Sequence, residues 1–445
     1  MKVSIIGTGY VGLVTGVCLA EKGHNVICVD VDAEKVEKIN RGVPTFYENG
    51  LEELLKKNLD AGVRATTELK AAVTGSDLTM IAVGTPFDGN EIDLSFVKNA
   101  AREIGEALRH KTGYHLVVVK STVVPGTTDE VVLPTLESAS GKKAGRDFGV
   151  GMNPEFLTEG EAIEDFMRPD RIVLGGIDER SIDLLSQLYR PFMDIPQLRT
   201  NTRTAEMIKY ASNALLAAMI SFSNEIGNLC AGIGGIDVVD VMKGVHLSKY
   251  ISVILPGGER HMPAIEGFLA AGCGFGGSCL PKDVKALIAH GEKFGTPMHL
   301  LNSVIKINKQ QHMKVIGLLK KHFPSLSGVR VAVLGLAFRP NTDDMRESPA
   351  IPIVRELISQ GASVLAYDPV AQNEARKVLG DRNIRYTSSA REAVEAAQAV
   401  VLVTRWDEFR SLPDFLSRME RQPVFVDGRR LIDRFAVANY EGIGL

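Results

Sequence analysis

The sequence predicts an α/β fold, with two doubly wound parallel-sheet domains joined by a long central helix and a helical middle domain. Strand and helix patterns alternate over roughly the first 200 residues, give way to purely helical patterns, and then alternate again to the C-terminus. Such alternation is typical of a parallel sheet covered by helices on both faces. Because 445 residues are too many for one ordinary core, we expect three domains, residues 1–200, 201–322 and 323–445.

The first domain opens as strand, glycine turn, helix and second strand. The apolar run "KVSIIG" is followed by the turn "TGYVG", by the helical stretch "LVTGVCLAEKG", which ends at Gly23, and by the strand "HNVICVD". Three later apolar runs, each closed by turn or small polar residues, predict further strands: "LTMIAVGTP", "HLVVVKSTVVPG" and "FGVGMNP".

The middle of the chain has no strand pattern. Residues 203–234 are predicted to form one long helix of about eight turns, and helical segments continue to about residue 320. After the linker "FPSLSGVR", four strand patterns return: "VRVAVLG", "ASVLAYDP", "QAVVLVT" and "PVFVDG". The first and third domains begin with related patterns, "KVSIIGTGYVG" and "VRVAVLGLAFR", which suggests a distant internal repeat.

Composition indicates a cytoplasmic, globular protein. The net charge is −3 with Lys and Arg spread along the chain, so we expect neither a nucleic-acid nor a membrane surface. No run of 18 apolar residues predicts a membrane span. The N-terminus superficially resembles a signal peptide, but its regularly spaced glycines would weaken an apolar helix. Five cysteines without a CxxC pair and nine unclustered histidines predict no disulfide framework and no metal site.

A dinucleotide site is predicted at the first turn. The GxGxxG pattern directly follows a strand and opens a helix, as in Rossmann-like domains, where the glycines let the backbone approach a pyrophosphate. Asp30 closes the next strand and is placed to bind a ribose 2′-hydroxyl, which favours NAD over NADP. Lys35 either reaches the adenosine side or is a surface residue, and a glycine turn in a domain that binds no nucleotide is the alternative. The residues of the pattern are Gly7, Gly9, Tyr10, Val11 and Gly12.

Three other strand ends carry small or functional groups. They are Thr85-Pro86, Ser121-Thr122 and Asn153-Pro154-Glu155. Each could be a simple turn, but ligands of such sheets bind at the carboxyl ends of the strands. Together we expect them to form the rim of a site.

The long helix and a cysteine loop complete the candidate site. Glu206, Lys209 and Asn213 fall on one stripe of the helix and either face solvent or line a site. In "GFGGSCLPKD", Pro281 is well placed as the first residue of a helix, which would place Cys279 at the mouth of that helix, beside Lys282 and Asp283.

A buried, inert cysteine is the alternative for Cys279, and Cys273 fits that description better. A nucleophilic thiol combined with NAD suggests oxidation of an alcohol to an aldehyde, capture by the thiol, a second oxidation to a thioester, and hydrolysis to a carboxylate.

The ordered motifs resemble the nucleotide-sugar 6-dehydrogenases over essentially the whole chain, most closely the UDP-glucose enzymes, with the GDP-mannose enzymes as near relatives. The motifs are GxGYVG, "VGTP", "KSTVVPGT", "NPEFLTEGEAIEDFMRPDRIVLG", "AEMIKYASNALLA", "GFGGSCLPKD" and "GLAFRPNTDDMRESP". The resemblance implies NAD-dependent, four-electron oxidation of the C6 alcohol of UDP-glucose to UDP-glucuronate. It also implies a UDP-sugar-binding third domain and a homodimer formed through the long helix.

The resemblance also implies roles for individual residues. Cys279 would be the nucleophile, Lys209 and Asp283 would serve the catalytic water and the oxyanion, and Asn213 would hold substrate and water. Thr122 and Glu159 would organise water, with Glu159 as a general base. Cofactor contacts would add Thr85, Thr122, Glu159, Lys282 and Arg346. Substrate contacts would be Glu155, Phe156, Leu157, Thr158, Glu159, Lys209, Asn213, Phe268, Leu269, Ala270, Ala271, Gly272, Phe275, Gly276, Arg260 and Arg339.

Two departures leave alternatives open. The segment before the cysteine loop is longer than the corresponding family segment. In ungapped register the family's substrate-binding arginine falls on Pro263, and Arg260 is the candidate replacement. The identity of the sugar and the contacts between subunits therefore stay undecided. "YENG" stands where the family often has Glu-Pro-Gly. GDP-mannose or a UDP-N-acetylhexosamine is the alternative substrate. A hydroxyacid or phosphogluconate-type dehydrogenase, or a catalytically silent sensor, would not need Cys279.

Overall fold

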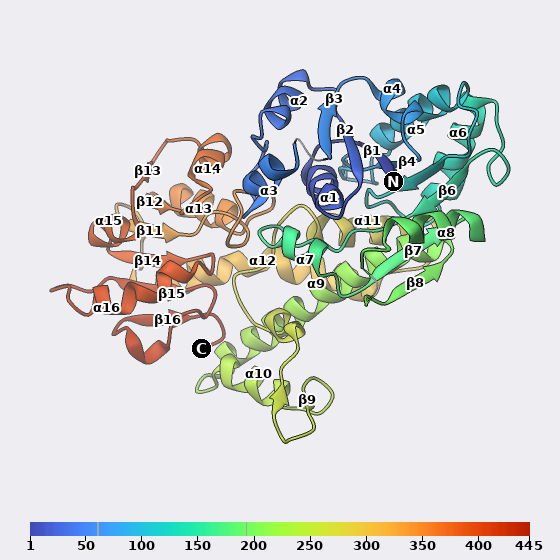
Figure 1. The fold of residues 1–445 in the computed structure, drawn as a ribbon. Coiled ribbons are helices and arrows are strands. Elements are labelled where there is room, and N and C mark those ends of the chain that lie inside the picture. The colour runs from blue at the N-terminus through green and yellow to red at the C-terminus, as the bar shows by residue number, and fades with distance from the viewer. Residues whose placement is uncertain (60–61, 193) are drawn as a thin grey trace. The chain divides into compact units, whose positions relative to one another are not determined.

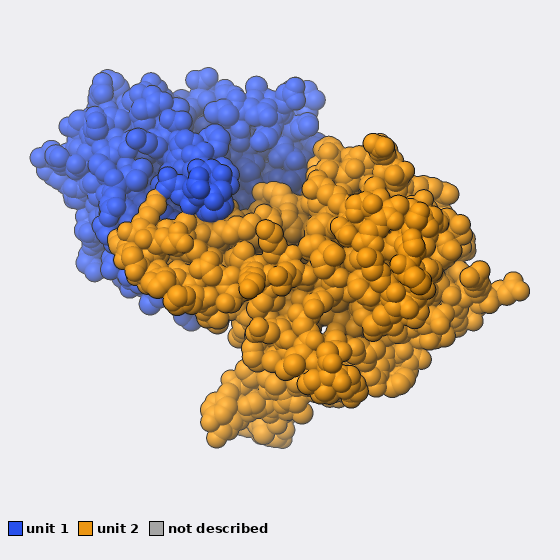
Figure 2. Space-filling model, turned by 180° about the vertical axis from the view of Figure 1, so that it is seen from behind, with its two compact units in different colours: residues 1–212 blue, residues 213–445 orange. Residues whose placement is uncertain are grey.

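The computed structural model of the chain describes residues 1–59, 62–192 and 194–445 (Figure 1). The chain forms two compact units, residues 1–212 and 213–445, which Figure 2 shows in blue and orange. The 32-residue helix α9 (Thr202–Ile233) passes from the first unit into the second and confirms the long helix expected from the sequence.

Unit 1 is built on an eight-stranded sheet with the order β3-β2-β1-β4-β5-β6-β7-β8. Every neighbouring pair is parallel except β6 and β7, which are antiparallel. The strands are β1 (Lys2–Ile6), β2 (Asn25–Val29), β3 (Val63–Thr66), β4 (Leu78–Ile81), β5 (Leu116–Val119), β6 (Gly149–Met152), β7 (Ile172–Gly176) and β8 (Gln197–Thr200).

Helices cover both faces of this sheet, as the near-continuous apolar strands require (Figure 1). One core joins the sheet to α1, α3, α7 and α8, and a second core joins its other face to α4, α5 and α6. The helices are α1 (Tyr10–Glu21), α2 (Ala33–Asn40), α3 (Leu51–Asn58), α4 (Leu69–Thr74), α5 (Ser95–Leu108), α6 (Leu133–Ser140), α7 (Ala162–Met167) and α8 (Glu179–Leu188), with the helical turn η1 (Thr128–Val132) before α6.

Unit 2 contains the central helices and a second sheet. Its six strands are all parallel, in the order β13-β12-β11-β14-β15-β16. They are β11 (Arg330–Leu334), β12 (Ser363–Tyr367), β13 (Ile384–Tyr386), β14 (Ala399–Leu402), β15 (Val424–Asp427) and β16 (Tyr440–Gly442). The predicted α/β class with two doubly wound sheets is confirmed.

The helices of unit 2 fall into a central group and a group around the sheet. The central group is α10 (Val238–His246), α11 (Leu280–Lys293) and α12 (His299–His322), with the short hairpin β9 (Val253–Ile254) and β10 (Arg260–His261) and the turn η2 (Ala264–Phe268). The others are α13 (Ala350–Ser359), α14 (Gln372–Leu379), α15 (Ala390–Glu395) and α16 (Leu412–Leu416), with the turns η3 (Asp407–Ser411) and η4 (Arg434–Ala436).

Central helices and the second sheet share one hydrophobic core. Val238 of α10 and Val315 of α12 belong to the same buried cluster as Val331 of β11 and Ile353 of α13. Because this core is continuous, residues 213–445 form one compact unit. The division of this part at residue 322 stays a prediction.

The first six strands of unit 1 and the six strands of unit 2 have the same order, which supports the internal repeat suggested by the sequence. The same turn follows the first strand of each sheet. Gly7 has φ +100° and Gly335 has φ +87°, a region that side chains disfavour. The N–H of Gly7 donates to the carbonyl of Val29, and the N–H of Gly335 donates to that of Tyr367.

By length and hydropathy alone, α9 could cross a membrane. It carries Glu206 and Lys209, however, and both are buried with hydrogen-bond or ion-pair partners within unit 1. Paired polar groups of this kind are typical of the core helix of a globular protein.

Candidate active site

The first turn of unit 1 fits a dinucleotide phosphate. A Cβ on Gly12 would lie 2.0 Å from the carbonyl oxygen of Gly7, and one on Gly7 would lie 2.6 Å from that of Ala82, so both positions need glycine. A Cβ on Gly9 would meet nothing within 4 Å, so the backbone there is open to a ligand. Helix α1 starts at Tyr10 without a side-chain cap. Its first N–H groups are therefore suited to a pyrophosphate.

Asp30 lies at the end of β2 beside this turn. Its Oδ2 accepts hydrogen bonds from the N–H (2.9 Å) and the hydroxyl (2.5 Å) of Thr8, and its Oδ1 accepts one from the N–H of Asp32. Partial burial acts to raise the pKa of Asp30, but these bonds, together with the charge of Lys35, hold it below its ordinary value. The carboxylate is half-buried and ionised, as binding of a ribose hydroxyl requires.

The three strand ends expected at the rim of a site lie side by side. The hydroxyl of Thr85 donates to the carbonyl of Thr122 (2.8 Å), which joins the end of β4 to the end of β5. The ammonium of Lys120 donates to Oδ1 of Asn153 (2.9 Å), which joins the end of β5 to the end of β6. These side chains therefore lie at one edge of the sheet, as expected from its topology.

A buried group of charges lies at the same edge. Nζ of Lys209, from α9, is 2.9 Å from Oε1 of Glu155, and both side chains are 4% exposed. Complete burial would raise the pKa of Glu155, but the charge and hydrogen bond of Lys209 hold it below the ordinary value. Burial lowers the pKa of Lys120 to about 8. The negative charge of Glu155 acts to raise this pKa, and the positive charge of Lys209 lowers it further. Lys120 and Lys209 thus place two buried ammonium groups around Glu155, and positive groups of this kind suit an anion or an oxyanion.

The loop after β6 is tied to the start of α1. The buried carboxylate of Glu48 accepts hydrogen bonds from the N–H groups of Gly160 (2.7 Å) and Ala162 (2.9 Å) and from the hydroxyl of Tyr10 (2.5 Å). Glu159, also buried, lies within this held segment, near enough to influence Tyr10 electrostatically. Glu48 therefore connects the predicted cofactor turn with the predicted substrate loop.

In unit 2, Cys279 is the N-cap of α11, and Pro281 is in the first turn of that helix. The helix begins at Leu280, one residue before the predicted start at Pro281, and the predicted place of Cys279 at the mouth of the helix is confirmed. The other four cysteines are buried, while Cys279 is half-buried. The N-terminus of a helix stabilises negative charge, so this thiol is placed to react as a thiolate.

Asp283 follows one turn later, and its N–H donates to the carbonyl of Cys279 (2.8 Å). Its buried carboxylate accepts a hydrogen bond from the side-chain amide of Asn213 (2.6 Å) and pairs with the ammonium of Lys282 (2.6 Å). The stripe on α9 is therefore not solvated: Asn213 meets Asp283, and Lys209 meets Glu155.

The backbone before Cys279 is held at almost every residue. Neighbouring backbone carbonyls accept two of its N–H groups: that of Gly428 accepts from Cys273, and that of Arg346 accepts from Gly277. A Cβ on Gly276 would lie 2.2 Å from the carbonyl oxygen of Glu347. The glycines of this loop are thus needed for close packing against the second sheet domain.

The remaining predicted substrate and cofactor residues of unit 2 lie in the segment before this loop, on the hairpin and after β11. Phe268 ends the turn η2, and the segment from Leu269 to Gly276 runs directly into the loop. Arg260 lies on the exposed hairpin strand β10, where its guanidinium donates to the carbonyl of Leu247 and the hydroxyl of Ser252. Arg339 is half-buried after β11, and the exposed Arg346 pairs with Asp344.

Several residues of the site were missed by the sequence analysis. Lys120 and Glu48 stand inside motifs that were recognised, "KSTVVPGT" and "YENG", but nothing local shows that they are buried. Arg429 donates to the carbonyl of Gly274, and Asn308 contacts Phe275. Neither residue belongs to a motif, and only the tertiary fold brings them to the loop.

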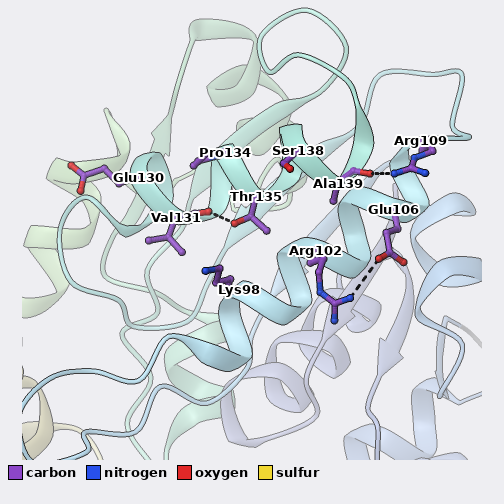
Figure 3. Close-up of a pocket in the computed structure, with 10 residues that line it drawn as sticks. All are labelled: Lys98, Arg102, Glu106, Arg109, Glu130, Val131, Pro134, Thr135, Ser138 and Ala139. Carbon is purple, nitrogen blue, oxygen red and sulfur yellow. Dashed lines mark hydrogen bonds and ion pairs between the residues drawn. The ribbon is translucent and has the colours of Figure 1, made fainter.

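An open, charged pocket lies elsewhere, between α5 and α6 (Figure 3). Lys98, Arg102 and Glu106 of α5 face Thr135 and Ser138 of α6 across it. None of the predicted site residues is among its lining residues, so this pocket is not the candidate site.

Comparisons with known proteins identify the family of the chain. Models of the UDP-glucose/GDP-mannose dehydrogenase family match in chain order: the NAD binding domain at residues 1–193, the central domain at 203–310 and the UDP binding domain at 332–434. The chain is 41% identical to UDP-glucose 6-dehydrogenase AglM of Haloferax volcanii over the full length of both chains. It is 39% identical to GDP-mannose 6-dehydrogenase of Pseudomonas aeruginosa, with 97% and 96% of the two chains covered.

Solved structures give the same result. A UDP-glucose dehydrogenase from Pyrobaculum islandicum superposes with a TM-score of 0.89 at 40% identity, covering 99% of this chain and 97% of that one. A UDP-D-ManNAc dehydrogenase from Pyrococcus horikoshii superposes with a TM-score of 0.83 at 29% identity, covering 100% and 99%. The chain therefore belongs to the UDP-glucose/GDP-mannose dehydrogenase family, the NAD-dependent dehydrogenases of nucleotide sugars.

Proposed function

We propose that this protein oxidises the C6 alcohol of UDP-glucose to the carboxylate of UDP-glucuronate, with two molecules of NAD reduced per sugar. The observation that carries the proposal is the half-buried Cys279 thiol at the mouth of α11, beside the buried Asp283. A single oxidation to an aldehyde or ketone would need no such nucleophile.

The chemistry runs in four steps. The alcohol first loses a hydride and a proton to become an aldehyde. The thiolate of Cys279 then adds to the aldehyde carbon, a C–S bond forms, and the oxygen gains a proton to give a thiohemiacetal. Loss of a second hydride and of that proton gives a thioester. Water finally adds to the thioester carbonyl, the C–S bond breaks, two protons are released, and the products are the carboxylate and the free thiolate.

When bound, NAD supplies the hydride acceptor in both oxidations. Gly7, Gly9 and Gly12 would admit its pyrophosphate, and Asp30 would bind its ribose. Thr85, Thr122 and Glu159 from unit 1 and Lys282 and Arg346 from unit 2 remain proposed further contacts.

The buried charges would serve the oxygen atoms of the sugar. We assign Lys209 to stabilising negative charge on the reacting oxygen, because its ammonium is already desolvated. Asn213 and Asp283 form a hydrogen-bonded pair next to the thiol's own helix, which suits them to hold the hydrolytic water. Glu159 is proposed as a general base, and Glu155 holds Lys209 in place through their ion pair.

UDP-glucose is preferred as the substrate because three UDP-glucose 6-dehydrogenases are 41–42% identical to this chain. GDP-mannose is the alternative, since a GDP-mannose enzyme is nearly as similar. A UDP-N-acetylhexosamine is a third possibility, supported by the fold of the UDP-D-ManNAc enzyme. The sugar would contact Phe268 to Gly276, Arg339 and Arg260, and the hairpin that carries Arg260 is the segment where specificity would differ.

We also propose a homodimer formed through α9, in the cytoplasm. From Leu215 onward, four large apolar side chains are exposed on this helix, and three of them are seven residues apart. Seven-residue spacing places them on one side, as in helices that pack against a partner helix. They are Leu215 (57% exposed), Phe222 (48%), Leu229 (59%) and Ile233 (62%).

The function is tested by the stoichiometry of NADH to sugar nucleotide with purified protein. UDP-glucose, GDP-mannose and UDP-N-acetylglucosamine are supplied separately with excess NAD, and both NADH and the uronate are quantified. Two NADH per UDP-glucose with little turnover of the other sugars supports the proposal. If two NADH form per molecule of a different sugar nucleotide, the thioester mechanism stands and that sugar nucleotide is the substrate.

Cys279→Ser tests the role of the thiol directly. Cys273→Ser, at a buried cysteine just before the loop, is the matched control. The first variant should form no uronate, whereas the second should keep the wild-type stoichiometry. One NADH per sugar in the wild type, or uronate formed at the wild-type rate by folded Cys279→Ser, would refute the role of the thiol.

A further inference from the structure

The loop that carries Cys279 is held by two side-chain amides from different helices. Asn308 of α12 contacts Phe275, and Asn224 of α9 contacts Gly272. All of these residues belong to unit 2. Neither asparagine has a role in the function proposed above.

Asn308 makes a two-point contact. Its Oδ1 accepts a hydrogen bond from the N–H of Phe275 (2.8 Å), and its Nδ2 donates to the carbonyl of the same residue (2.9 Å). Both polar groups of one peptide segment are thereby fixed in the plane of one amide, much as a neighbouring strand would fix them. A Cβ on the preceding Gly274, which has φ +105°, would lie 2.9 Å from Oδ1 of Asn308, so the amide packs directly on the loop.

Asn224 holds the loop at its start. Its side chain is fully buried, and its Oδ1 accepts a hydrogen bond from the N–H of Gly272 (2.8 Å). A buried N–H without an acceptor is costly, so this contact favours one position of the loop over others. The two asparagines act at points three residues apart, on the segment that leads to the thiol.

We propose that Asn308 and Asn224 are positioning residues that set the place of Cys279 relative to the substrate. The inference rests on the proposed nucleophilic role of Cys279. Both amides are neutral, so they act on the position of the loop and not on the charge of the thiol. Small displacements of a reacting group can lower turnover severely, because productive geometry is narrow.

The test compares Asn308→Ala and Asn224→Ala with Asn302→Ala. Asn302 lies on the same helix as Asn308 and is exposed, and its amide only bonds back to Met298. We expect kcat to fall about tenfold or more in the first two variants. The KM for NAD should stay within about twofold of wild type, because the glycine turn and Asp30 belong to unit 1 and because Lys282 and Arg346 are held by their own ion pairs with Asp283 and Asp344. Asn302→Ala should leave both constants unchanged.

Amide hydrogen exchange of the unliganded protein measures the loop directly. Peptides covering residues 272–279 should exchange about tenfold faster or more in Asn308→Ala, while peptides of unit 1 keep the wild-type rate. Wild-type kcat in both variants, or unchanged exchange of the loop, would overturn the proposal. If the stoichiometry test removes the role of Cys279, the exchange result still decides whether the amides hold the loop.

A second substitution covers the case in which Asn308→Ala does not fold. Asn308→Asp keeps the side-chain volume and the acceptor for the N–H of Phe275, and loses the donor to the carbonyl. We expect kcat to fall and the KM for NAD to stay unchanged, because an oxygen would then face the carbonyl oxygen of Phe275 without a proton between them. Wild-type turnover and wild-type exchange of the loop in this variant would also count against the two-point contact.

Discussion

Two aspartates at matching strand ends differ in whether they can bind a ligand. Asp30 and Asp368 follow the second strand of their respective sheets, and each accepts a hydrogen bond from the turn after the first strand. Asp30 is half-buried and open to a ligand. Asp368 is buried, and its oxygens accept four backbone N–H groups and the indole N–H of Trp406. Only the first carboxylate has capacity left for a ribose.

Replacing Asp30 should therefore change the choice of cofactor. In Asp30→Ala we expect the KM for NAD to rise by about tenfold, roughly the value of one charge-assisted hydrogen bond, and the discrimination against NADP to weaken. Initial rates with both cofactors measure the change. Glu34→Ala, an exposed carboxylate in the first turn of α2, is the control. Unchanged kinetic constants in Asp30→Ala would exclude the ribose contact.

The buried Lys120 predicts a particular pH dependence of stability. The pKa of Lys120 is lowered to about 8 in the folded protein from 10.5, mainly by burial. Between these values the unfolded chain binds the extra proton, so the free energy of unfolding increases with pH, by up to about 1.4 kcal/mol per pH unit. Below pH 8 both states are charged and this dependence disappears.

The measurement is urea unfolding of wild type and Lys120→Met from pH 7 to pH 9.5. Methionine has a similar shape and no charge, so the difference between the two proteins isolates Lys120. Above pH 8, the free energy of unfolding of the wild type should increase relative to that of Lys120→Met. A difference that stays constant across this range would mean that Lys120 titrates normally.

These side chains also show where sequence reasoning ends. The cofactor turn and the cysteine loop could be predicted because their function depends on neighbours in sequence: glycines that admit a ligand, and a proline that starts a helix. The pairing of Lys209 with Glu155 could not be predicted, since it joins residues from different elements. The same holds for Glu48 and Asn308, which act on loops far from them in the chain.

Among the helices, α9 shows how one element can serve a core and a site at once. Its first turns place Glu206 against the turn before α6, where the carboxylate accepts hydrogen bonds from the N–H of Gly126 (2.6 Å) and from the N–H (2.8 Å) and hydroxyl (2.6 Å) of Thr128. The next turn presents Lys209 to Glu155. The sequence predicted the length of this helix but left open whether its polar stripe was solvated. It did not predict the antiparallel pair of β6 and β7.

Removing the carboxylate of Glu206 should destabilise unit 1. Glu206→Ala leaves buried donors without an acceptor, at a cost of about 1–3 kcal/mol, whereas Glu225→Ala on an exposed part of α9 should change little. Burial raises the pKa of Glu206 to about 7 from 4.5, so the folded protein keeps this proton while the unfolded chain loses it. The contribution of Glu206 to the free energy of unfolding should therefore decline as pH rises from 4.5 to 7.

Urea unfolding at pH 5 and pH 7 tests both points. The difference in free energy of unfolding between wild type and Glu206→Ala should be larger at pH 5 than at pH 7. A gap of equal size at the two values would show that the carboxyl is already ionised at pH 5, and no gap would show that the hydrogen bonds contribute nothing to stability.

For the chain as a whole, the proposed dimer follows from the exposed apolar side of α9. The fold class could be predicted from the alternation of strands and helices, but the shared core of the central helices and the second sheet could not, because it depends on how helices far apart in sequence pack. That core uses one side of α9 and leaves Phe222 outside.

A charge on this side should separate the subunits. We expect Phe222→Glu to weaken dimerisation by about 2 kcal/mol or more, roughly 30-fold in the dissociation constant. Light scattering coupled to size-exclusion chromatography measures the mass. Phe96→Glu, at a similarly exposed phenylalanine of α5, should keep the wild-type mass. A dimer of unchanged affinity in Phe222→Glu would place the interface elsewhere.

The two aspartates at matching strand ends have a consequence for the history of the chain. If both sheets descend from one duplicated ancestor, the same carboxylate has been kept for opposite reasons: in one copy to meet a ligand, in the other to hold the fold. Mutational tolerance should then diverge between the copies. Substitutions of Asp30 would accumulate in lineages that change cofactor, whereas substitutions of Asp368 would be removed by selection for folding, whatever the enzyme oxidises.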